Sequence, residues 1–485
     1  MDALAFEHHL TSPQGRGREP HGAVTGTAGG ADCGDEVTLS IALDGEQVAD
    51  AGFEARGCGA AAASASAAVT LLRGRPVLAA AHLRAADIAA ELGGLSPGKL
   101  HAAEVAADAL HRALGAAVRK MRPLARPETG RTLVAMSGGV DSAVAALLCA
   151  EQEGEVIAVT LELWSDLEND GERSCCSASA VAQARSLAHG MGLAHFTMDL
   201  RKEFTAGVVG PFIDGFAAGE TPNPCVRCNG HVRLDAMLEL ADTLGCEHLA
   251  TGHYARLAEL DHRAGPLLRV AADPAKDQSY MLAALAPGSL ARMRFVLGEL
   301  TKPRVREIAH AAALPVASKP ESQDLCFLAG TDRSRFLAKH GQVARRPGEL
   351  VDTDGNILGV HDGQHRFTVG QRRGIALPAP EPVYVLAKDA ATNRVTVGPR
   401  RELRRGRVEI RDVRLHRPGA RVDRVKLRYR SQPLSASLPG NPPAGRHAAM
   451  SVMLREPAEA VAPGQLACLM DGELMIGRGT IARSS

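Results

Sequence analysis

The sequence contains few aromatic residues and no long apolar run. Aromatic side chains make up 3% of the 485 residues. No stretch of about 18 uncharged apolar residues occurs, so a membrane span is not supported. The first residues include Asp2 and Glu7 and place no apolar segment after basic residues, which argues against a secretory signal. We therefore expect a cytoplasmic protein without a membrane partner.

Cysteine is also scarce for a chain of this length, with ten residues in all. Such a number does not make a disulfide framework, and in a reducing compartment the thiols are better explained as catalytic groups or metal ligands. The hydrophobic content of 45% and the charged content of 23% are those of a folded globular protein. The length suggests about three or four domains.

Acidic residues are depleted at one end of the chain. From Arg400 onward there are 17 Lys and Arg against 8 Asp and Glu, although the net charge of the whole chain is only +1. A basic terminal segment beside an acidic remainder favours contact with a polyanion, most commonly nucleic acid. The alternative is a solvated, arginine-rich surface.

Local patterns predict a multidomain α/β protein. Residues 1–24 lack apolar periodicity and predict a flexible arm. Alternating strands at 37–43 and 47–53, followed by Ala-rich helices ending at 72 and 119, predict a small α+β domain over 25–122. The prolines and glycine of 123–130 predict a linker.

Beyond the linker the pattern changes to strands that alternate with helices, which predicts a doubly wound parallel sheet over 131–335. A Gly/Pro-rich stretch with short strands follows and predicts a small β-rich central domain over 336–405. Regular short strands over 406–485 predict a C-terminal antiparallel β-barrel.

A glycine-rich segment, Ser137-Gly138-Gly139-Val140-Asp141-Ser142, follows an apolar strand and opens a helix. In this context backbone N–H groups and the helix dipole bind phosphate. The segment lacks the lysine of a Walker loop and the spacing of the dinucleotide fingerprint. A glycine-rich turn without a ligand is the alternative.

This segment resembles the pyrophosphate loop of ATP pyrophosphatases, which adenylate an oxygen and then let a nucleophile displace AMP. Further motifs over about 131–485 resemble those of bacterial tRNA-specific 2-thiouridylases, in the same order along the chain. These motifs are Asn223-Pro224-Cys225-Val226-Arg227-Cys228-Asn229, Thr251-Gly252-His253-Tyr254, Lys276-Asp277-Gln278-Ser279-Tyr280, Ser322-Gln323-Asp324-Leu325-Cys326-Phe327, Phe367-Thr368-Val369-Gly370-Gln371-Arg372-Arg373-Gly374 and Leu427-Arg428-Tyr429-Arg430.

The resemblance implies 2-thiolation of the wobble uridine of tRNA, with ATP and Mg²⁺. Cys326 would carry sulfur as a persulfide supplied by a cysteine desulfurase or a sulfur-relay protein, and Cys228 would be the nucleophile that forms a disulfide with it. Two buried thiols without a chemical role are the alternative. The implied ATP-binding residues are Ala135, Met136, Ser137, Gly138, Gly139, Val140, Asp141, Ser142, Leu161 and Gly252.

The same resemblance implies contacts with the RNA. Asn223, Pro224 and Cys225 would meet the target base, while Lys276, Asp277, Gln278, Arg428 and Tyr429 would contact the tRNA. Position 225 departs from the family pattern, because many relatives have Asp there. Cys225, Cys228 and Cys326 could therefore hold a 4Fe-4S cluster instead of a persulfide relay. Cys175 and Cys176 receive no role.

The N-terminal segment resembles the NifU/IscU-like iron–sulfur scaffold domain. Cys33, Asp35, Cys58 and His101 match its ligands for a cluster or zinc, but Ala102 stands where the family has a third cysteine. This leaves two interpretations open, a retained metal or sulfur-delivery site and a degenerate docking domain.

Two other functions remain compatible with the sequence. Nitrogen chemistry on the same loop, as in argininosuccinate or asparagine synthesis, would make the cysteines dispensable. An iron–sulfur carrier or RNA-binding protein with a vestigial ATP site would release no pyrophosphate.

Overall fold

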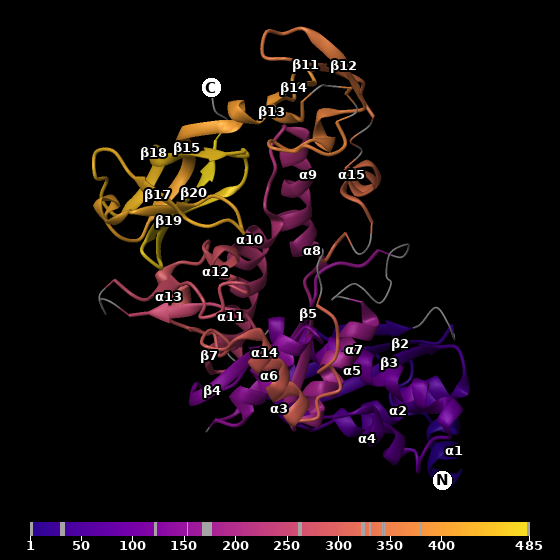
Figure 1. Cartoon of the computed structure of the whole chain (residues 1–485). Coiled ribbons are helices and arrows are strands. Elements are labelled where there is room, and N and C mark those ends of the chain that lie inside the picture. The colour runs from indigo at the N-terminus through magenta and orange to yellow at the C-terminus, as the bar shows by residue number, and fades with distance from the viewer. Residues whose placement is uncertain are drawn as a thin grey trace.

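The computed structural model shows four β-sheets (Figure 1). No helix among the described residues is long and apolar enough to cross a membrane. The predicted fold class is confirmed. The residues that the structure describes are 3–29, 34–120, 124–152, 154–166, 177–259, 264–321, 325–328, 331–341, 343, 345–375, 377–378 and 381–482.

The N-terminal part is a three-stranded antiparallel sheet backed by helices, in the strand order β1-β2-β3. Alternation of apolar residues places Leu39 and its partner Phe53 on the buried face. The strands are β1 (Val24–Gly29), β2 (Glu36–Asp44) and β3 (Gln47–Arg56), and the helices are α1 (Ala3–Thr11), α2 (Gly59–Leu72), α3 (Val77–Ala80), α4 (Ala85–Glu91), η1 (Pro97–Lys99) and α5 (Leu100–Lys120).

The prediction of a flexible arm over 1–24 is wrong for the described residues of that range. Helix α1 packs on α2, where His9 is 5% exposed and its Nδ1 lies 2.9 Å from the Ser66 hydroxyl. Phe6 packs against the apolar core and lies under the Lys99 ammonium. A few well-placed contacts hold this segment despite its lack of periodicity.

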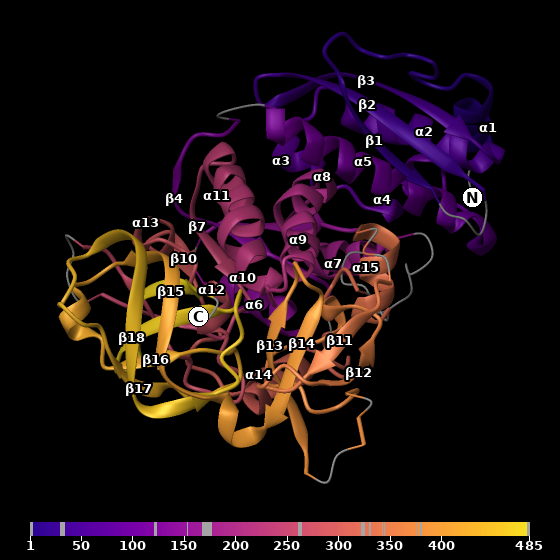
Figure 2. The same ribbon diagram turned by 90° about the horizontal axis from the view of Figure 1, so that it is seen from above.

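The second sheet contains five parallel strands in the order β10-β7-β4-β5-β6, with helices on both faces (Figure 2). Its strands are β4 (Glu128–Ala135), β5 (Val156–Glu162), β6 (Ala194–Asp199), β7 (Cys246–Thr251) and β10 (Met293–Arg294). The helices of this part are α6 (Val140–Ala150), α7 (Ala178–Gly190), α8 (Arg201–Phe204), η2 (Thr205–Val209), α9 (Gly210–Ala217), α10 (Pro224–Cys228), η3 (Asn229–Arg233), α11 (Leu234–Thr243), α12 (Ser279–Leu282), α13 (Pro287–Leu290), α14 (Lys302–Ala311) and α15 (Arg333–Gly341).

Helix α5 of the N-terminal part lies along β6, the free edge of this parallel sheet. The His111 ring nitrogen Nδ1 lies 2.9 Å from the His195 carbonyl oxygen, and the Arg119 guanidinium donates to the Asp199 carbonyl oxygen at 2.6 Å. Between them, a Cβ on Gly115 would meet the Thr197 oxygen at 1.8 Å. Only glycine permits this approach, so α5 occupies the edge where another strand would otherwise pair.

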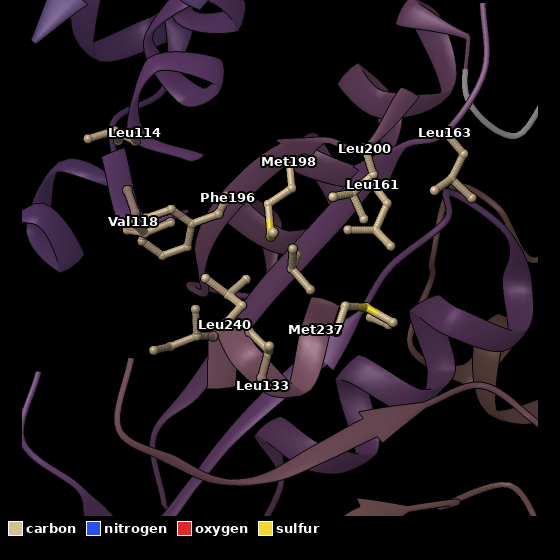
Figure 3. Close-up of a cluster of buried hydrophobic side chains, with 14 of the residues drawn as sticks. Leu114, Val118, Leu133, Leu161, Leu163, Phe196, Met198, Leu200, Met237 and Leu240 are labelled. Carbon is tan, nitrogen blue, oxygen red and sulfur yellow. The ribbon is translucent and has the colours of Figure 1, made fainter. Parts of the chain in front are cut away.

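The contact between the two parts is a continuous apolar core (Figure 3). Leu114 and Val118 of α5 belong to the same buried cluster as Phe196 and Met198 of β6 and Leu240 of α11. Burying each such side chain contributes about 1.5–3 kcal/mol. The N-terminal part is therefore packed onto the parallel sheet rather than tethered to it.

The last two sheets are antiparallel or mixed. A four-stranded sheet in the order β12-β11-β14-β13 is followed by a barrel in which β15, β18, β17, β16, β19 and β20 close through the pairing of β15 with β20. Strands β8 and β9 extend the barrel sheet from β20. The bounds are β8 (Arg256–Ala258), β9 (Leu267–Arg269), β11 (Gly348–Val351), β12 (Ile357–His361), η4 (Gln364–Arg366), β13 (Val383–Asp389), β14 (Arg394–Pro399), η5 (Arg400–Leu403), β15 (Arg404–Leu415), η6 (Gly419–Arg421), β16 (Arg424–Lys426), β17 (Leu434–Ser437), β18 (Gly445–Glu459), β19 (Leu466–Asp471) and β20 (Leu474–Ile481).

Candidate functional site

The glycine-rich loop joins the end of β4 to the start of α6. Gly138 has φ +67°, and Gly139 is the N-cap of α6. The Ser142 hydroxyl accepts from the Ser137 N–H at 3.1 Å and lies 3.1 Å from the Ser137 hydroxyl. These bonds hold the loop in a turn over the helix N-terminus, which is the arrangement that binds phosphate.

Lysines from distant segments surround this loop, and the sequence patterns did not reveal them. The Lys302 ammonium donates to Asp141 Oδ1 at 2.6 Å and lies 3.2 Å from Glu321. The Lys319 ammonium donates to the Gly138 carbonyl oxygen at 3.0 Å. Two lysine ammonium groups thus lie at this loop, whereas a Walker loop supplies one.

The other predicted nucleotide residues lie on neighbouring strands of the same sheet edge. Leu161 is buried near the end of β5. Gly252 follows β7, and a Cβ there would meet the Ser142 N–H nitrogen at 2.8 Å. The Met136 N–H donates to the Val159 carbonyl oxygen at 2.8 Å, so the first loop residue continues the sheet. Ala135 is buried at the end of β4, and Val140 is buried at the start of α6.

Helix α10 carries two of the cysteines. Asn223 caps it, with its Oδ1 accepting from the N–H groups of Cys225 at 3.1 Å and Val226 at 3.3 Å, and Pro224 occupies its first turn. Cys225 is partly exposed, whereas Cys228 is buried at the end of the helix. Because residues three apart share one helix face, Cys225 and Cys228 lie on the same side of α10.

A chain of contacts connects α10 to the phosphate loop. The Tyr254 hydroxyl donates to Asp141 Oδ1 at 2.8 Å, and the Tyr254 N–H donates to Gln278 Oε1 at 2.9 Å. Gln278 precedes α12, where the Met281 carbonyl oxygen accepts from the Asn229 side chain at 3.3 Å. Asn229 directly follows Cys228.

Cys326 lies partly buried against the same core. Its neighbour Phe327 packs edge to face against Phe204 and Phe212, with ring centroids 5.9 and 5.1 Å apart. The Arg227 side chain of α10 donates to the Gly207 carbonyl oxygen at 2.5 Å, in the same helical stretch. Both thiol segments therefore pack on residues 201–217. Three residues of the second cysteine motif, Ser322, Gln323 and Asp324, lie outside the described residues.

The predicted RNA-contacting residues differ in their freedom to bind. Asp277 is 8% exposed and paired with Lys426 at 3.0 Å. Lys276 pairs with Glu321 at 2.5 Å. The Arg428 guanidinium donates to the Ala460 carbonyl oxygen at 2.5 Å, and burial lowers its pKa. Asp277 thus already uses its oxygens in joining the barrel to the nucleotide-binding part.

Tyr429 lies beside Tyr280, with ring centroids 6.4 Å apart. Burial raises the pKa of Tyr429. The structure thus brings Tyr429 of the barrel beside Tyr280 of α12, a helix that α10 contacts.

Three other cysteines are buried away from this site. Burial raises the pKa of Cys149 to about 11 and those of Cys246 and Cys468 to about 12. Such thiols remain protonated and unreactive at neutral pH. Cys175 and Cys176 lie outside the described residues.

A second cluster of ligand atoms lies in the N-terminal part. Asp35, Cys58 and His101 place one ligand atom each within 4.8 Å of one another. The Cys58 thiol donates to Asp35 Oδ2 at 3.2 Å, and His101 Nε2 lies 3.1 Å from the same oxygen. Although burial raises the pKa of Asp35, hydrogen bonds from Cys58 and His101 outweigh it and lower that pKa.

The geometry of this cluster suits a metal ion. His101 Nδ1 lies 3.1 Å from the Gly98 carbonyl oxygen, and a metal ion that replaced the hydrogen between Nε2 and Asp35 would leave Nδ1 as the donor to that oxygen. Gly57 has φ +115°, and a Cβ there would lie 2.1 Å from Asp35 Oδ1. Cys, His and Asp form an acceptable ligand set for zinc. Cys33 lies outside the described residues, and Ala102 is fully buried in α5.

Four family models match successive parts of the chain. They are the NifU-like N terminal domain at residues 5–122, the tRNA methyl transferase HUP domain at 130–330, the tRNA methyl transferase PRC-barrel domain at 334–399 and the Aminomethyltransferase beta-barrel domain at 415–481.

Complete proteins match as well. The chain is 42% identical to the bifunctional protein NifU/MnmA of Rubrobacter xylanophilus, with 98% of this chain and 97% of that protein covered. It is 40% identical to the tRNA-specific 2-thiouridylase MnmA of Magnetococcus marinus and 42% identical to that of Acidithiobacillus ferrooxidans. Each of these two alignments covers 72% of this chain and 98% of the relative.

Proposed function

The chain belongs to the family of bifunctional NifU/MnmA proteins, and from this premise we propose that it is a tRNA 2-thiouridylase. In the proposed reaction the 2-oxygen of a wobble uridine attacks the α-phosphorus of ATP, and pyrophosphate leaves. The adenylated oxygen is then a leaving group on C2, which the free carbonyl lacks. A sulfur nucleophile displaces AMP from it.

The observation that carries this proposal is the pairing of a phosphate-binding turn with two lysines. Lys302 and Lys319 lie against the loop at Asp141 and Gly138. Cations held in place stabilise the charge that develops on phosphate oxygens in the transition state. Bound Mg²⁺ would share that charge with the two ammonium groups.

The sulfur step uses the two thiols whose segments both pack on residues 201–217. The terminal sulfur of a persulfide on Cys326 attacks C2 of the base and displaces AMP. The Cys228 thiolate then attacks the Cys326 sulfur, which releases 2-thiouridine and leaves a Cys228–Cys326 disulfide. An external thiol reductant returns both cysteines to thiols, and a cysteine desulfurase or a relay protein restores the persulfide.

The RNA would enter beside α10, with the target base at Asn223, Pro224 and Cys225. Lys276 and Gln278 line this approach from the loop before α12, and Arg428 and Tyr429 line it from the barrel. The position of Tyr429 beside Tyr280, in a helix that α10 contacts, supports this arrangement. Asp277 would hold the two parts together through Lys426 rather than contact RNA directly.

For the N-terminal part we propose a retained metal or iron–sulfur site held by Asp35, Cys58 and His101, with Cys33 as the further ligand by sequence. A metal ion bound there would supply the chemistry of thiolate-bound zinc. A nascent cluster would supply thiolate-bound iron and sulfide. The buried carboxylate and the oriented imidazole are the groups that this chain contributes.

Pyrophosphate release and 2-thiouridine formation test the activity directly. The purified protein with ATP, unmodified tRNA and a persulfide donor should release pyrophosphate and yield 2-thiouridine by mass spectrometry. Cys228→Ser should abolish thiolation, whereas a matched Cys149→Ser variant should retain it. Full turnover by Cys228→Ser, or no tRNA-dependent pyrophosphate release from any tRNA pool, would contradict the proposal.

The iron content distinguishes the persulfide relay from a cluster at Cys225, Cys228 and Cys326. After anaerobic purification, the relay predicts that Cys225→Ala changes neither iron nor sulfide content. Loss of about four irons per chain in Cys225→Ala would favour the cluster. Cys58→Ser and His101→Ala should each lower the zinc or iron content of the N-terminal site.

A further inference from the structure

Two groups bind the same carboxylate oxygen at the phosphate loop. The Lys302 ammonium donates to Asp141 Oδ1 at 2.6 Å, and the Tyr254 hydroxyl donates to the same oxygen at 2.8 Å. Asp141 is the second residue of α6, so its carboxylate belongs to the first turn of that helix. Two donors on one charged oxygen fix the direction of the carboxylate and the place of the ammonium.

Tyr254 is held in place by a reciprocal pair of hydrogen bonds. Its N–H donates to Gln278 Oε1 at 2.9 Å, and its carbonyl oxygen accepts from the Gln278 N–H at 2.8 Å. The side chain is 2% exposed. Burial raises the pKa of this phenol, and the charge of Asp141 contributes in the same direction. The phenol therefore stays protonated at neutral pH and acts as a donor to Asp141.

Glu321 is the second carboxylate that contacts Lys302. Its Oε1 lies 3.2 Å from the Lys302 ammonium, and its Oε2 accepts from the Lys276 ammonium at 2.5 Å. The hydrogen bond from Lys276 lowers the pKa of Glu321, and Lys302 contributes in the same direction. The Lys302 side chain is only 9% exposed. A buried ammonium keeps its charge through partners of this kind.

Lys276 and Gln278 come from one short loop, which the barrel holds. Asp277, between them, is 8% exposed, and its Oδ2 accepts from the Lys426 ammonium of β16 at 3.0 Å. In both views the barrel lies beside α12, the helix that follows this loop (Figures 1 and 2). Both contacts to the network at the phosphate loop therefore start from a loop whose position the barrel sets.

The chemistry of phosphate gives this network its importance. An ammonium stabilises charge that develops on phosphate oxygens most strongly when it is already in position, because no reorganisation is then needed during the reaction. A lysine side chain is otherwise flexible and can adopt many rotamers. Contacts with Asp141 and Glu321 restrict Lys302 from two directions, and the Tyr254 hydroxyl restricts Asp141 in turn.

We infer that Tyr254 and Glu321 are positioning residues for the ATP chemistry. Tyr254 orients Asp141, and Asp141 and Glu321 together hold the Lys302 ammonium at the phosphate loop. Both residues act through Lys302, and neither needs to touch the nucleotide. The inference rests on the proposed function, because the charge that Lys302 stabilises is that of the ATP phosphates.

A double-mutant cycle with Lys302→Gln tests this inference on the full-length chain. Two quantities are measured: kcat/KM for tRNA-dependent pyrophosphate release, and the Kd of Mg²⁺-ATP by isothermal titration calorimetry without RNA. Tyr254→Phe and Glu321→Gln should each lower kcat/KM about tenfold and raise the Kd about threefold. In the Lys302→Gln background, either substitution should change both quantities by less than about twofold.

The second lysine supplies the comparison background. Lys319 bonds to the Gly138 carbonyl oxygen, so in Lys319→Gln the substitutions Tyr254→Phe and Glu321→Gln should keep their full effect. Tyr384→Phe, in β13, and Glu307→Gln, which removes an exposed partner of Arg304, are the matched controls. Both controls should behave like the parent.

Equal effects in the Lys302→Gln and Lys319→Gln backgrounds would overturn the inference, because a merely structural role lowers activity in either background. Parental values in both single variants would overturn it too, as would faster pyrophosphate release by Glu321→Gln. If one variant fails to fold, the cycle with the other decides. If the parent binds ATP but releases no pyrophosphate with any tRNA, the proposed function fails, and the cycle in Kd alone decides the inference.

Discussion

Arg112 of helix α5 forms an ion pair with Glu162, the last residue of strand β5. The Arg112 Nε lies 3.1 and 3.2 Å from the two carboxylate oxygens, and Glu162 is 6% exposed. Glu162 follows Leu161, one of the proposed ATP-binding residues. The N-terminal part is therefore connected to the nucleotide end of the parallel sheet.

Removing this arginine should destabilise the protein. Arg112→Ala leaves the Glu162 carboxylate buried without its partner, which costs about 3–5 kcal/mol. The free energy of unfolding in urea should fall by that order, and the KM for ATP should rise. Arg56→Ala removes a solvent-exposed arginine that lies 3.9 Å from Glu36, and its stability should stay near the parental value. Equal losses in the free energy of unfolding for the two substitutions would show that the buried ion pair stabilises the protein no more than the exposed pair.

The approach of α5 to β6 should be sensitive to a single methyl group. Gly115→Ala places a Cβ 1.8 Å from the Thr197 oxygen, so α5 must move away from the sheet edge. We expect a loss of about 1–3 kcal/mol, as for overpacking in a rigid core, together with faster proteolysis at 124–127. Gly190→Ala is the control, because a Cβ there meets nothing within 4 Å. A Gly115→Ala protein as stable as this control would contradict the described contact.

The lysines at the phosphate loop should be needed for ATP chemistry. Lys302→Gln removes the cation next to Asp141, and pyrophosphate release should fall by roughly 10²-fold in kcat/KM. Lys319→Gln should have a similar effect through Gly138. The exposed Lys202 is a suitable control, and its replacement by Gln should leave the rate unchanged. Normal kcat/KM in both loop variants would show that neither lysine takes part in the ATP chemistry.

Acid should weaken the contact between α5 and the sheet through His189. Burial lowers the pKa of this residue from 6.5 to about 4, and its Nε2 lies 3.1 Å from the Ala81 carbonyl oxygen. Below pH 6.5 the unfolded chain binds a proton that the folded chain does not, so stability falls as the pH falls toward 4. Between pH 7 and pH 5 this residue should contribute a loss of roughly 2 kcal/mol.

The pH dependence of the urea midpoint measures this contribution. His189→Gln should flatten the dependence between pH 7 and pH 5, whereas His21→Gln, at an exposed position, should not. The same slope in both variants would exclude His189 as its source.

The regular elements could be predicted from the sequence because their periodicity is local. The strand predicted at 37–43 is β2 (Glu36–Asp44), and the helix predicted to end at 119 is α5 (Leu100–Lys120). Strand β1 (Val24–Gly29) was missed because its sequence, VTGTAG, offers few large apolar residues. Its burial comes from Gly26, where a Cβ would meet the Ala113 nitrogen at 2.2 Å, and no local pattern encodes that contact.

The candidate site shows the same contrast between local patterns, which could be predicted, and long-range contacts, which could not. The phosphate loop could be located because its glycines and hydroxyls are consecutive in the chain. Lys302 and Lys319 lie more than 150 residues away, and nothing in their spacing connects them to Ser137. The burial of Asp277 against Lys426 could not be predicted either, because it depends on how the barrel packs against the preceding part.

Helix α5 at the edge of the parallel sheet also determines what happens when the chain is divided. A fragment that begins after residue 123 keeps every proposed ATP and sulfur residue but leaves the carbonyl oxygens of His195 and Asp199 uncovered, together with the apolar surface around Phe196. An uncovered strand of this kind recruits other strands and aggregates. The N-terminal part would therefore be required for the solubility of the rest of the chain, whether or not sulfur passes from one part to the other.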